Sequence, residues 1–293
     1  MRIVAVVTAY NSAETIGRAL ESIFQQTRTA DAVIVVDDGS GDDTLDRVRP
    51  FGDVRVVARL NGGAAAARNS GIAAALAERA DWIAFLDGDD RWLPEKLAYV
   101  EQAAHTYPES AVLYSSVLAV EGHEVEERSG SDADVLGVEE MLAGCPILTP
   151  SCAVLNVAAL AHVGGFNERR RDGEDWEFWL RLSEHGPLRR MRGPLTVYYI
   201  HEKGIHNRYV STRSEATRFV SRAGLALLRR RGIAALPALR RAWAAHFGAY
   251  TYYASLERRV GLTALTGAAA ALADPVQGGY AAGRSLVRAV TGA

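Results

Sequence analysis

Cysteine is scarce in this sequence, which has two, Cys145 and Cys152, among 293 residues. Two cysteines cannot form the disulfide framework that stabilises many small secreted proteins. Neither has neighbours at the spacing of a metal site. We therefore expect both to be small buried residues of a protein that works in a reducing compartment.

Long hydrophobic runs are also missing, and none reaches the roughly 18 apolar residues that a transmembrane helix requires. The first apolar run, residues 3–7, has five residues and is soon followed by Tyr10 and Asn11. This pattern is typical of a strand rather than of a signal peptide. We therefore expect a cytoplasmic protein.

Acidic residues are rare in the last part of the chain. Residues 207–293 contain 3 acidic residues and 13 arginines, a net charge of +10, whereas residues 1–206 carry −12. This asymmetry predicts one domain over residues 1–206 and a basic, mainly helical extension over residues 207–293. The helices expected in the extension are residues 215–230, 238–256, 264–273 and 283–290.

The basic extension has three open uses. A cationic helical face with aromatic side chains suits peripheral contact with the anionic inner face of a membrane. The same helices could instead pack on the acidic part of the chain or form a homo-oligomer. No recognised nucleic-acid-binding module is present, so we expect no nucleic-acid partner.

Apolar runs alternate with helical periodicity over residues 1–107. Strands without polar alternation are buried on both faces, which predicts an α/β fold with a mainly parallel sheet flanked by helices. The expected strands are residues 3–8, 32–36, 54–58 and 82–86, and the expected helices are residues 13–26, 43–48, 64–79 and 94–107. Weaker patterns predict strands at 111–120, 151–155 and 195–200 and helices at 138–142 and 174–184.

Polar residues gather where three of these strands end. They are Thr8, Tyr10 and Asn11 after the first, Asp37 and Asp38 after the second, and the acidic turn Asp87, Asp89 and Asp90 after the fourth. The carboxyl ends of parallel strands form a ligand crevice, and crowded carboxylates indicate a cation or a metal-bound polyphosphate. For residues 37–40, an ordinary turn with a helix cap is the alternative.

Two further segments carry polar residues of the same kind. Residues 61–63, Asn-Gly-Gly, precede a helix that bears Arg68, which suits a phosphate contact, although a plain loop with a solvated arginine has the same pattern. Glu174 and Asp175 stand at a helix start, where acidic residues often serve only as caps. A carboxylate there could also act as a general base.

Taken in order, these segments resemble the motif set of the family 2 glycosyltransferases with the GT-A fold. The resemblance covers about residues 1–205. One departure is Val7, where the family often has proline. The motifs are Thr8-Ala9-Tyr10-Asn11, Val36-Asp37-Asp38-Gly39-Ser40, Asn61-Gly62-Gly63 with Arg68-Asn69, Phe85-Leu86-Asp87-Gly88-Asp89-Asp90, and Gly164-Gly165-Phe166 followed by Glu174-Asp175-Trp176.

The resemblance implies a role for each site residue. Nucleobase binding falls to Thr8, Tyr10, Asn11, Asp37 and Asp38, Arg68 lies near base or phosphate, and Asp87 contacts ribose or metal. Asp89 binds Mn²⁺ or Mg²⁺ through the donor diphosphate, with His201 as a further candidate ligand and His206 as its rival. Asp175, beside Glu174, is the base of an inverting displacement.

These roles predict an inverting, metal-dependent glycosyltransferase. Its donor would be a UDP-, dTDP- or GDP-sugar, and its acceptor a carbohydrate or lipid-linked hydroxyl in cell-surface polysaccharide or glycoconjugate synthesis. A sugar-nucleotide-forming nucleotidyltransferase is an alternative, although residues 8–12 lack the Gly-rich, Lys-containing loop usual in such enzymes. A non-catalytic sugar-nucleotide-binding protein is the other.

Overall fold

The computed structural model describes residues 1–170, 173–200, 227–229 and 235–244. The chain divides into two compact units, of which the first comprises Met1–Gly137 and Pro146–His201. The second comprises Val138–Cys145 and Glu202–Ala293. The boundary expected near residue 206 lies outside the described residues.

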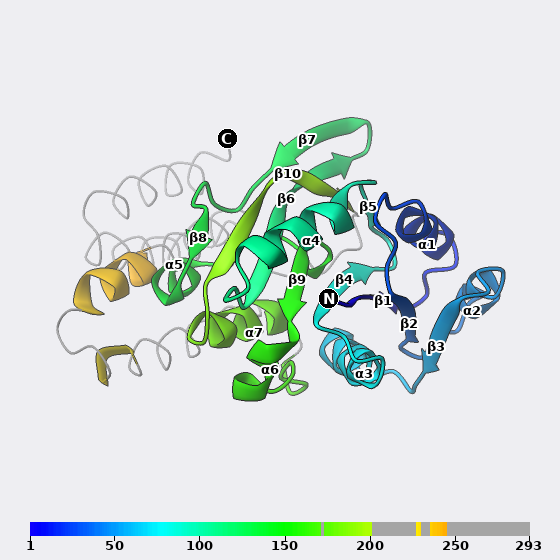
Figure 1. Cartoon of the computed structure of the whole chain (residues 1–293), viewed down its shortest axis with the longest axis horizontal. Coiled ribbons are helices and arrows are strands. Elements are labelled where there is room, and N and C mark those ends of the chain that lie inside the picture. The colour runs from blue at the N-terminus through cyan, green and yellow to red at the C-terminus, as the bar shows by residue number, and fades with distance from the viewer. Residues whose placement is uncertain (171–172, 201–226, 230–234, 245–293) are drawn as a thin grey trace, which may run out of the picture. The chain divides into compact units, whose positions relative to one another are not determined.

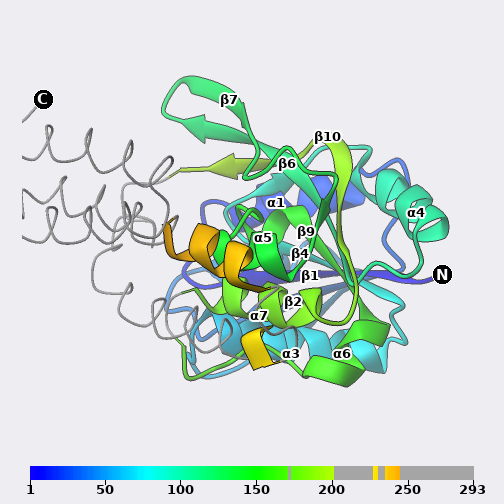
Figure 2. The ribbon, with the colours of Figure 1, turned by 90° about the vertical axis from the view of Figure 1, so that its left-hand side faces the viewer.

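A ten-stranded sheet runs through the described part of the first unit (Figures 1 and 2). Its first half is parallel, as the buried apolar runs predict. The strands of this half, in spatial order, are β3 (Val54–Ala58), β2 (Ala32–Asp37), β1 (Ile3–Ala9) and β4 (Trp82–Asp87).

The second half of the sheet is mixed. Strand β9 (Ala153–Asn156) lies antiparallel between β4 and β6 (Val112–Glu121), and β10 (Leu188–Tyr199) runs parallel to β6. Three short strands complete the sheet by antiparallel pairing. They are β5 (Arg91–Trp92), β7 (Glu124–Arg128) and β8 (Val135–Leu136).

Helices cover both faces of this sheet. On one face, α1 (Ile16–Phe24), α2 (Thr44–Val48) and α4 (Lys96–Thr106) pack on a core that includes Ile3, Ala5 and Val7 of β1. On the other, a methyl group added to Gly71 would lie 2.3 Å from Val6 Cγ1, so β1 and α3 (Ala64–Ala77) are in close contact. Successive side chains of β1 thus point alternately toward the two layers of helices.

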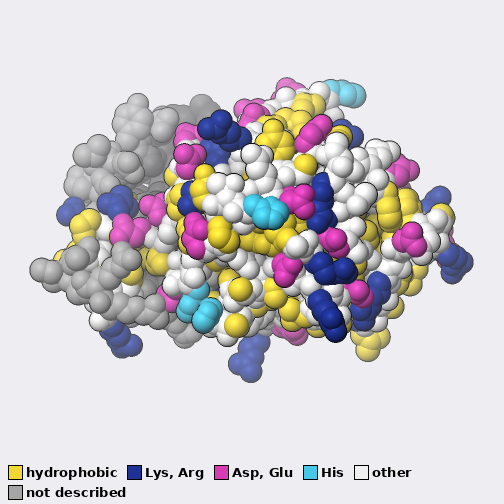
Figure 3. Space-filling view, viewed as in Figure 1, with side chains coloured by type: hydrophobic (Ala, Val, Ile, Leu, Met, Phe, Trp, Pro, Cys, Tyr) yellow, Lys and Arg dark blue, Asp and Glu magenta, His cyan; other side chains and the backbone are white. Residues whose placement is uncertain are grey.

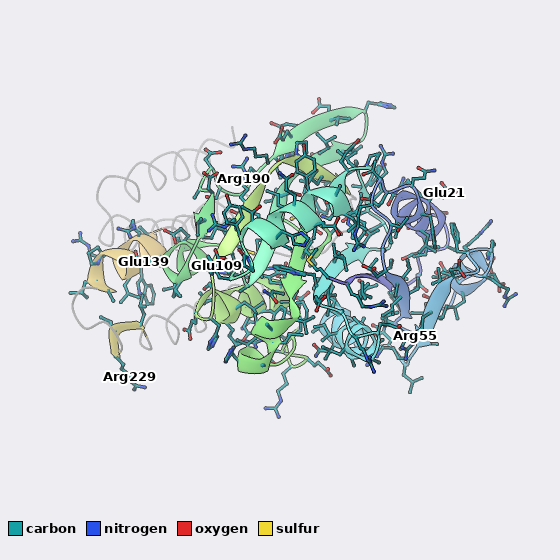
Figure 4. All side chains as sticks on the ribbon, in the orientation of Figure 1. Glu21, Arg55, Glu109, Glu139, Arg190 and Arg229 are labelled. Carbon is teal, nitrogen blue, oxygen red and sulfur yellow. The ribbon has the colours of Figure 1, made fainter. Side chains whose placement is uncertain are left out.

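Two more helices, α6 (Val157–Val163) and α7 (Glu174–Ser183), lie on the α3 face (Figure 1). The Arg55 side chain of β3 extends to the end of α3, where its Nη1 donates to Glu78 Oε1 at 3.0 Å (Figure 4). Side chains of both charges are interspersed on the face shown in Figure 3. The acidic excess of the first unit therefore forms no single acidic patch there.

The strands and helices expected over residues 1–107 are present, with ends shifted by up to three residues. The sequence interpretation missed α6, β5, β7 and β8, and it began β10 at residue 195 rather than at Leu188. Strand β7 has only exposed residues, so it has no hydrophobic alternation to recognise. Irregular pairing around Pro194 interrupts β10.

Described residues of the second unit include α5 (Val138–Ala143) and a helix over residues 236–244. Arg241 Nη2 donates to Glu139 Oε2 at 2.9 Å, which ties this helix to α5. Parts of the expected helices 215–230 and 238–256 are seen, whereas 264–273 and 283–290 lie outside the described residues. Of the helices in the described ranges, none combines the length and hydropathy of a membrane span.

Candidate active site

The register of the parallel strands places polar side chains together at one rim of the sheet. Thr8 of β1 pairs with Asp87 of β4, and Ala9 pairs with Asp37 of β2. Thr8 Oγ1 donates to Asp87 Oδ1 at 3.0 Å. The strand ends that the sequence predicted to meet are therefore joined by a hydrogen bond between side chains on the α3 and α7 face.

Arg68 of α3 is buried at the centre of this rim. Its Nη2 donates to Asp87 Oδ1 at 3.0 Å and its Nη1 to Glu174 Oε1 at 2.8 Å. Burial alone would lower the pKa of Arg68, but Asp87, Glu174 and Asp175 outweigh it and raise the pKa above its usual value. Arg68 is thus a cation bound by carboxylates from β4 and α7, and not the solvated arginine of the alternative interpretation.

Asp175 lies in the first turn of α7, after Gly173, whose φ of +63° starts the helix in a left-handed conformation. Trp176 N donates to Asp175 Oδ1 at 2.7 Å. Burial and then the neighbouring Glu174 charge raise the pKa of Asp175 to about 6, although Arg68 acts in the opposite direction. A carboxylate with that pKa can accept a proton near neutral pH.

The Gly-Gly-Phe turn before α7 is held by Asn69, the residue after Arg68. Asn69 Nδ2 donates to Phe166 O at 2.9 Å, and Phe166 N donates to Asn69 Oδ1 at 2.7 Å. Phe166 also packs edge-on against Phe85 of β4, with ring centroids 5.8 Å apart. The sequence singled out both segments but not this contact, which anchors the chain leading to Asp175.

The residues expected at the nucleobase are arranged around the ends of β1 and β2. Tyr10 is 54% exposed, which leaves its ring open to stacking. Asn11 has a φ of +50°, and its Oδ1 accepts from Gly41 N at 2.8 Å. Asp37 Oδ2 accepts from Ser40 N at 3.2 Å. This hydrogen bond is the one expected if residues 37–40 form an ordinary turn.

Asp38 is buried and clamps the glycine pair. Gly63 N donates to Asp38 Oδ2 at 2.8 Å, Gly62 N donates to the same carboxylate, and Arg59 forms an ion pair with it. Asp38 thereby fixes the loop before α3. Sequence reasoning missed Arg59, because an arginine after a strand has no pattern that marks an ion pair with the residue that follows a neighbouring strand.

The acidic turn follows β4, and its members differ in environment. A methyl group on Gly88 would lie 3.2 Å from Thr8 O and Ser12 Oγ, so the turn is packed against the first loop. Arg18 Nη2 donates to Asp89 O at 2.8 Å. Asp90 is buried and accepts from Tyr199 N at 3.2 Å. Burial, with the charges of Asp87 and Asp89, raises the pKa of Asp90.

The carboxylate oxygens of this turn suit a cation that is also coordinated by a phosphate group. Within the described ranges, no three His, Cys, Asp or Glu side chains converge as a metal cage. Mg²⁺ is usually held by one or two carboxylates together with phosphate oxygens, which requires no such cage. Asp89 and Asp87 can supply those carboxylates, whereas the proposed ligand His201 lies outside the described residues.

Comparisons with known proteins agree with this geometry. The family model described as Glycosyl transferase family 2 matches residues 4–164. The succinoglycan biosynthesis protein ExoO of Rhizobium meliloti is 39% identical over 142 residues, which cover 46% of this chain and 39% of ExoO. The chain thus spans less than half of that relative.

A second relative is covered more fully. The Escherichia coli UDP-Glc:alpha-D-GlcNAc-diphosphoundecaprenol beta-1,3-glucosyltransferase WfaP is 29% identical over 198 residues, which cover 66% of this chain and 75% of WfaP.

Solved structures show the same fold. S. aureus TarS in complex with UDP-GlcNAc has a TM-score of 0.72 at 18% identity, with 99% of this chain and 89% of that chain covered. The mannosyltransferase PcManGT from Pyrobaculum calidifontis, in complex with GDP-Man and Mn²⁺, has a TM-score of 0.55 at 22% identity, with 99% and 86% covered. The GT-A fold expected from the sequence is therefore confirmed.

Proposed function

This chain belongs to glycosyl transferase family 2, and we propose that it moves a sugar from a nucleotide-diphosphate donor to a hydroxyl group with inversion at the anomeric carbon. The observation that carries this proposal is the position of Asp175. Arg68 joins α7, which bears Asp175, to Asp87 at the end of β4. The buried guanidinium group of Arg68 thus holds the helix of the proton acceptor next to a residue that is expected to bind the donor.

The donor would lie along the rim from β2 to the acidic turn. Tyr10 would stack on the base, with Asn11, Asp37 and Asp38 beside it, and Thr8 and Asp87 would lie near the ribose. Arg68 would act near the phosphates through the carboxylates that it holds. The donor would thus pass the carboxyl ends of β2, β1 and β4, which are neighbours in the sheet in that order.

In the transfer step, the acceptor oxygen forms a bond to the anomeric carbon while the bond from that carbon to the diphosphate oxygen breaks. The nucleoside diphosphate leaves with the bonding electron pair. The hydroxyl proton passes to the carboxylate of Asp175, whose Oδ1 also accepts from Trp176 N. Glu174 keeps the pKa of Asp175 raised by its charge. A single displacement of this kind needs one base and no enzyme nucleophile.

Mn²⁺ or Mg²⁺ would be held by Asp89 and Asp87, with His201 as a further candidate ligand. When bound, such a cation supplies positive charge that stabilises the departing diphosphate. The protein itself supplies a tightly packed turn that presents carboxylates at the end of β4.

The acceptor is proposed to be a carbohydrate or a lipid-linked sugar in polysaccharide synthesis. WfaP is named for a GlcNAc-diphosphoundecaprenol acceptor and ExoO for succinoglycan biosynthesis, and these names support the acceptor class. A cytoplasmic location with peripheral contact at the inner face of the membrane, through the basic residues 207–293, would bring the site to such an acceptor.

A donor screen tests this function. Thermal unfolding would be measured with UDP-, dTDP- and GDP-sugars, with and without Mn²⁺, and hydrolysis of each donor would be followed alongside. We expect one nucleotide class to raise the Tm, more strongly with Mn²⁺, and to be hydrolysed. The proposal is wrong if no donor binds or turns over, or if the protein instead releases pyrophosphate from a nucleoside triphosphate and a sugar phosphate.

A further inference from the structure

A buried segment behind the acidic turn, the support segment Thr149–Ser151, contacts that turn from a distant part of the sequence. Thr149 caps the short 3-10 helix η1 (Pro150–Cys152), and its Oγ1 accepts from Ser151 N at 3.2 Å. The same Oγ1 lies 3.4 Å from Asp87 Oδ2 and 3.4 Å from Asp90 Oδ2. Thr149 Oγ1, which accepts from Ser151 N, is thus placed to donate its single proton to either of the two carboxylates.

Ser151 holds the backbone of the turn. Its Oγ accepts from Asp87 N at 2.9 Å, at the last residue of β4. Ser151 is fully buried, so water does not compete for its Oγ. The side chain of Ser151 therefore fixes the point from which the acidic turn leaves the sheet.

The support segment is itself anchored in the core. Ser151 O accepts from Trp92 Nε1 at 3.0 Å, from Lys96 Nζ at 3.0 Å and from Thr196 Oγ1 at 3.1 Å. Burial lowers the pKa of Lys96 to about 8, so the ammonium stays largely protonated at neutral pH and its bond is charge-assisted. The carbonyl oxygen of Ser151 thus accepts hydrogen bonds from side chains of β5, α4 and β10.

These contacts have a consequence for the three carboxylates of the turn. Asp87, Asp89 and Asp90 lie within four residues and their like charges repel one another, so contacts from outside the turn help to hold its shape. We propose that Thr149 and Ser151 are positioning residues that keep the acidic turn in the shape that binds the donor diphosphate and its cation. This inference rests on the proposed function.

Thr149→Val and Ser151→Ala remove the two hydroxyl groups with little change in volume. Supporting groups around a metal site typically change metal affinity by about 10- to 100-fold. We therefore expect each variant to raise the Kd for Mn²⁺, measured by electron paramagnetic resonance with UDP, dTDP or GDP present, by about tenfold. The KM for the donor should rise with it, while kcat measured with saturating donor and Mn²⁺ falls less.

Two further variants make the test specific. Thr149→Ser keeps the hydroxyl and should restore the Kd to within about twofold of wild type. Ser110→Ala is the matched control, because Ser110 is also fully buried but its Oγ has no hydrogen-bond partner in the part of the chain that the structure describes. It should leave the Kd for Mn²⁺ unchanged.

The possible results separate the two proposals. Binding of Mn²⁺ and nucleotide by wild type, with the same Kd in Thr149→Val, Ser151→Ala and Ser110→Ala, overturns the positioning role alone. Failure of Thr149→Ser to restore binding also overturns it, because the hydroxyl would then not be the group that matters. Absence of nucleotide binding in wild type overturns the proposed function, and the positioning role with it.

Discussion

Arg68 and Glu174 are 106 residues apart in the sequence, and Arg68 Nη1 donates to Glu174 Oε1 at 2.8 Å inside the protein. The other end of the guanidinium donates to Asp87. The arginine thus joins the helix that bears the proposed base to the strand that bears the acidic turn, and its planar fork suits two carboxylates at once.

Replacing this arginine should therefore damage both folding and activity. Arg68→Met removes the buried cation that two partly buried carboxylates, Asp87 and Glu174, share, which we expect to lower the free energy of unfolding by about 3 kcal/mol. Arg55→Met is the matched control, because Arg55 forms a half-exposed ion pair with Glu78. Its cost should stay below about 1 kcal/mol in urea unfolding. Equal effects of the two substitutions would contradict the bridging role.

The pH dependence of transfer should follow Asp175. A base with a pKa of about 6 is lost as the pH falls, so kcat/KM should decline below about pH 6. Glu174→Gln removes a charge that raises this pKa, and we expect the acidic limb of the profile to move to lower pH. A limb that stays in place in Glu174→Gln would show that another group titrates there.

The same carboxyl group should make stability depend on pH. The pKa of Asp175 in the folded state, about 6, lies above its ordinary value of 3.8, so the folded state binds more protons between those pH values. The ionised carboxylate therefore costs stability above about pH 6. Asp175→Asn should raise the unfolding free energy by about 1–2 kcal/mol at pH 7, and this gain should disappear below about pH 4. Denaturant unfolding at both pH values measures it, and a loss of stability at pH 7 would count against the assignment.

The contact between Asn69 and the Gly-Gly-Phe turn before α7 can be tested at Gly165. A methyl group at Gly165 would lie 2.3 Å from Asn69 Oδ1, so Gly165→Ala should displace the amide and destabilise the protein by about 1–3 kcal/mol. Gly17 lies inside α1 and has no atom within 4 Å of an added methyl group. Gly17→Ala should be neutral or stabilise by up to about 1 kcal/mol. Thermal unfolding compares the two, and a neutral Gly165→Ala would show that Asn69 does not constrain the turn.

Much of the first unit could be predicted because its strands are continuous apolar runs that end in polar residues. The meeting of Thr8 and Asp87 follows from that pattern and from the parallel pairing of β1 with β4. The resemblance to family 2 glycosyltransferases added the expectation that Asp175 is a base.

The contacts that hold the site could not be predicted in the same way. Arg59, Asn69, Thr149 and Ser151 act through hydrogen bonds to residues that are distant in the sequence. Polar side chains in loops and turns carry no periodicity, and the apolar pattern of residues 151–155 predicts only a strand. Their partners become visible only when the register of the sheet is known.

The most direct test of the account is to measure sugar transfer and donor binding on the same preparation of Asp175→Asn, with Mn²⁺ and the nucleotide sugar selected by the screen. Asparagine keeps the shape of the side chain but cannot take a proton. We predict that donor affinity stays within about threefold of wild type while transfer falls by about 100-fold or more. Transfer at the wild-type rate by Asp175→Asn would contradict the central claim that Asp175 is the base.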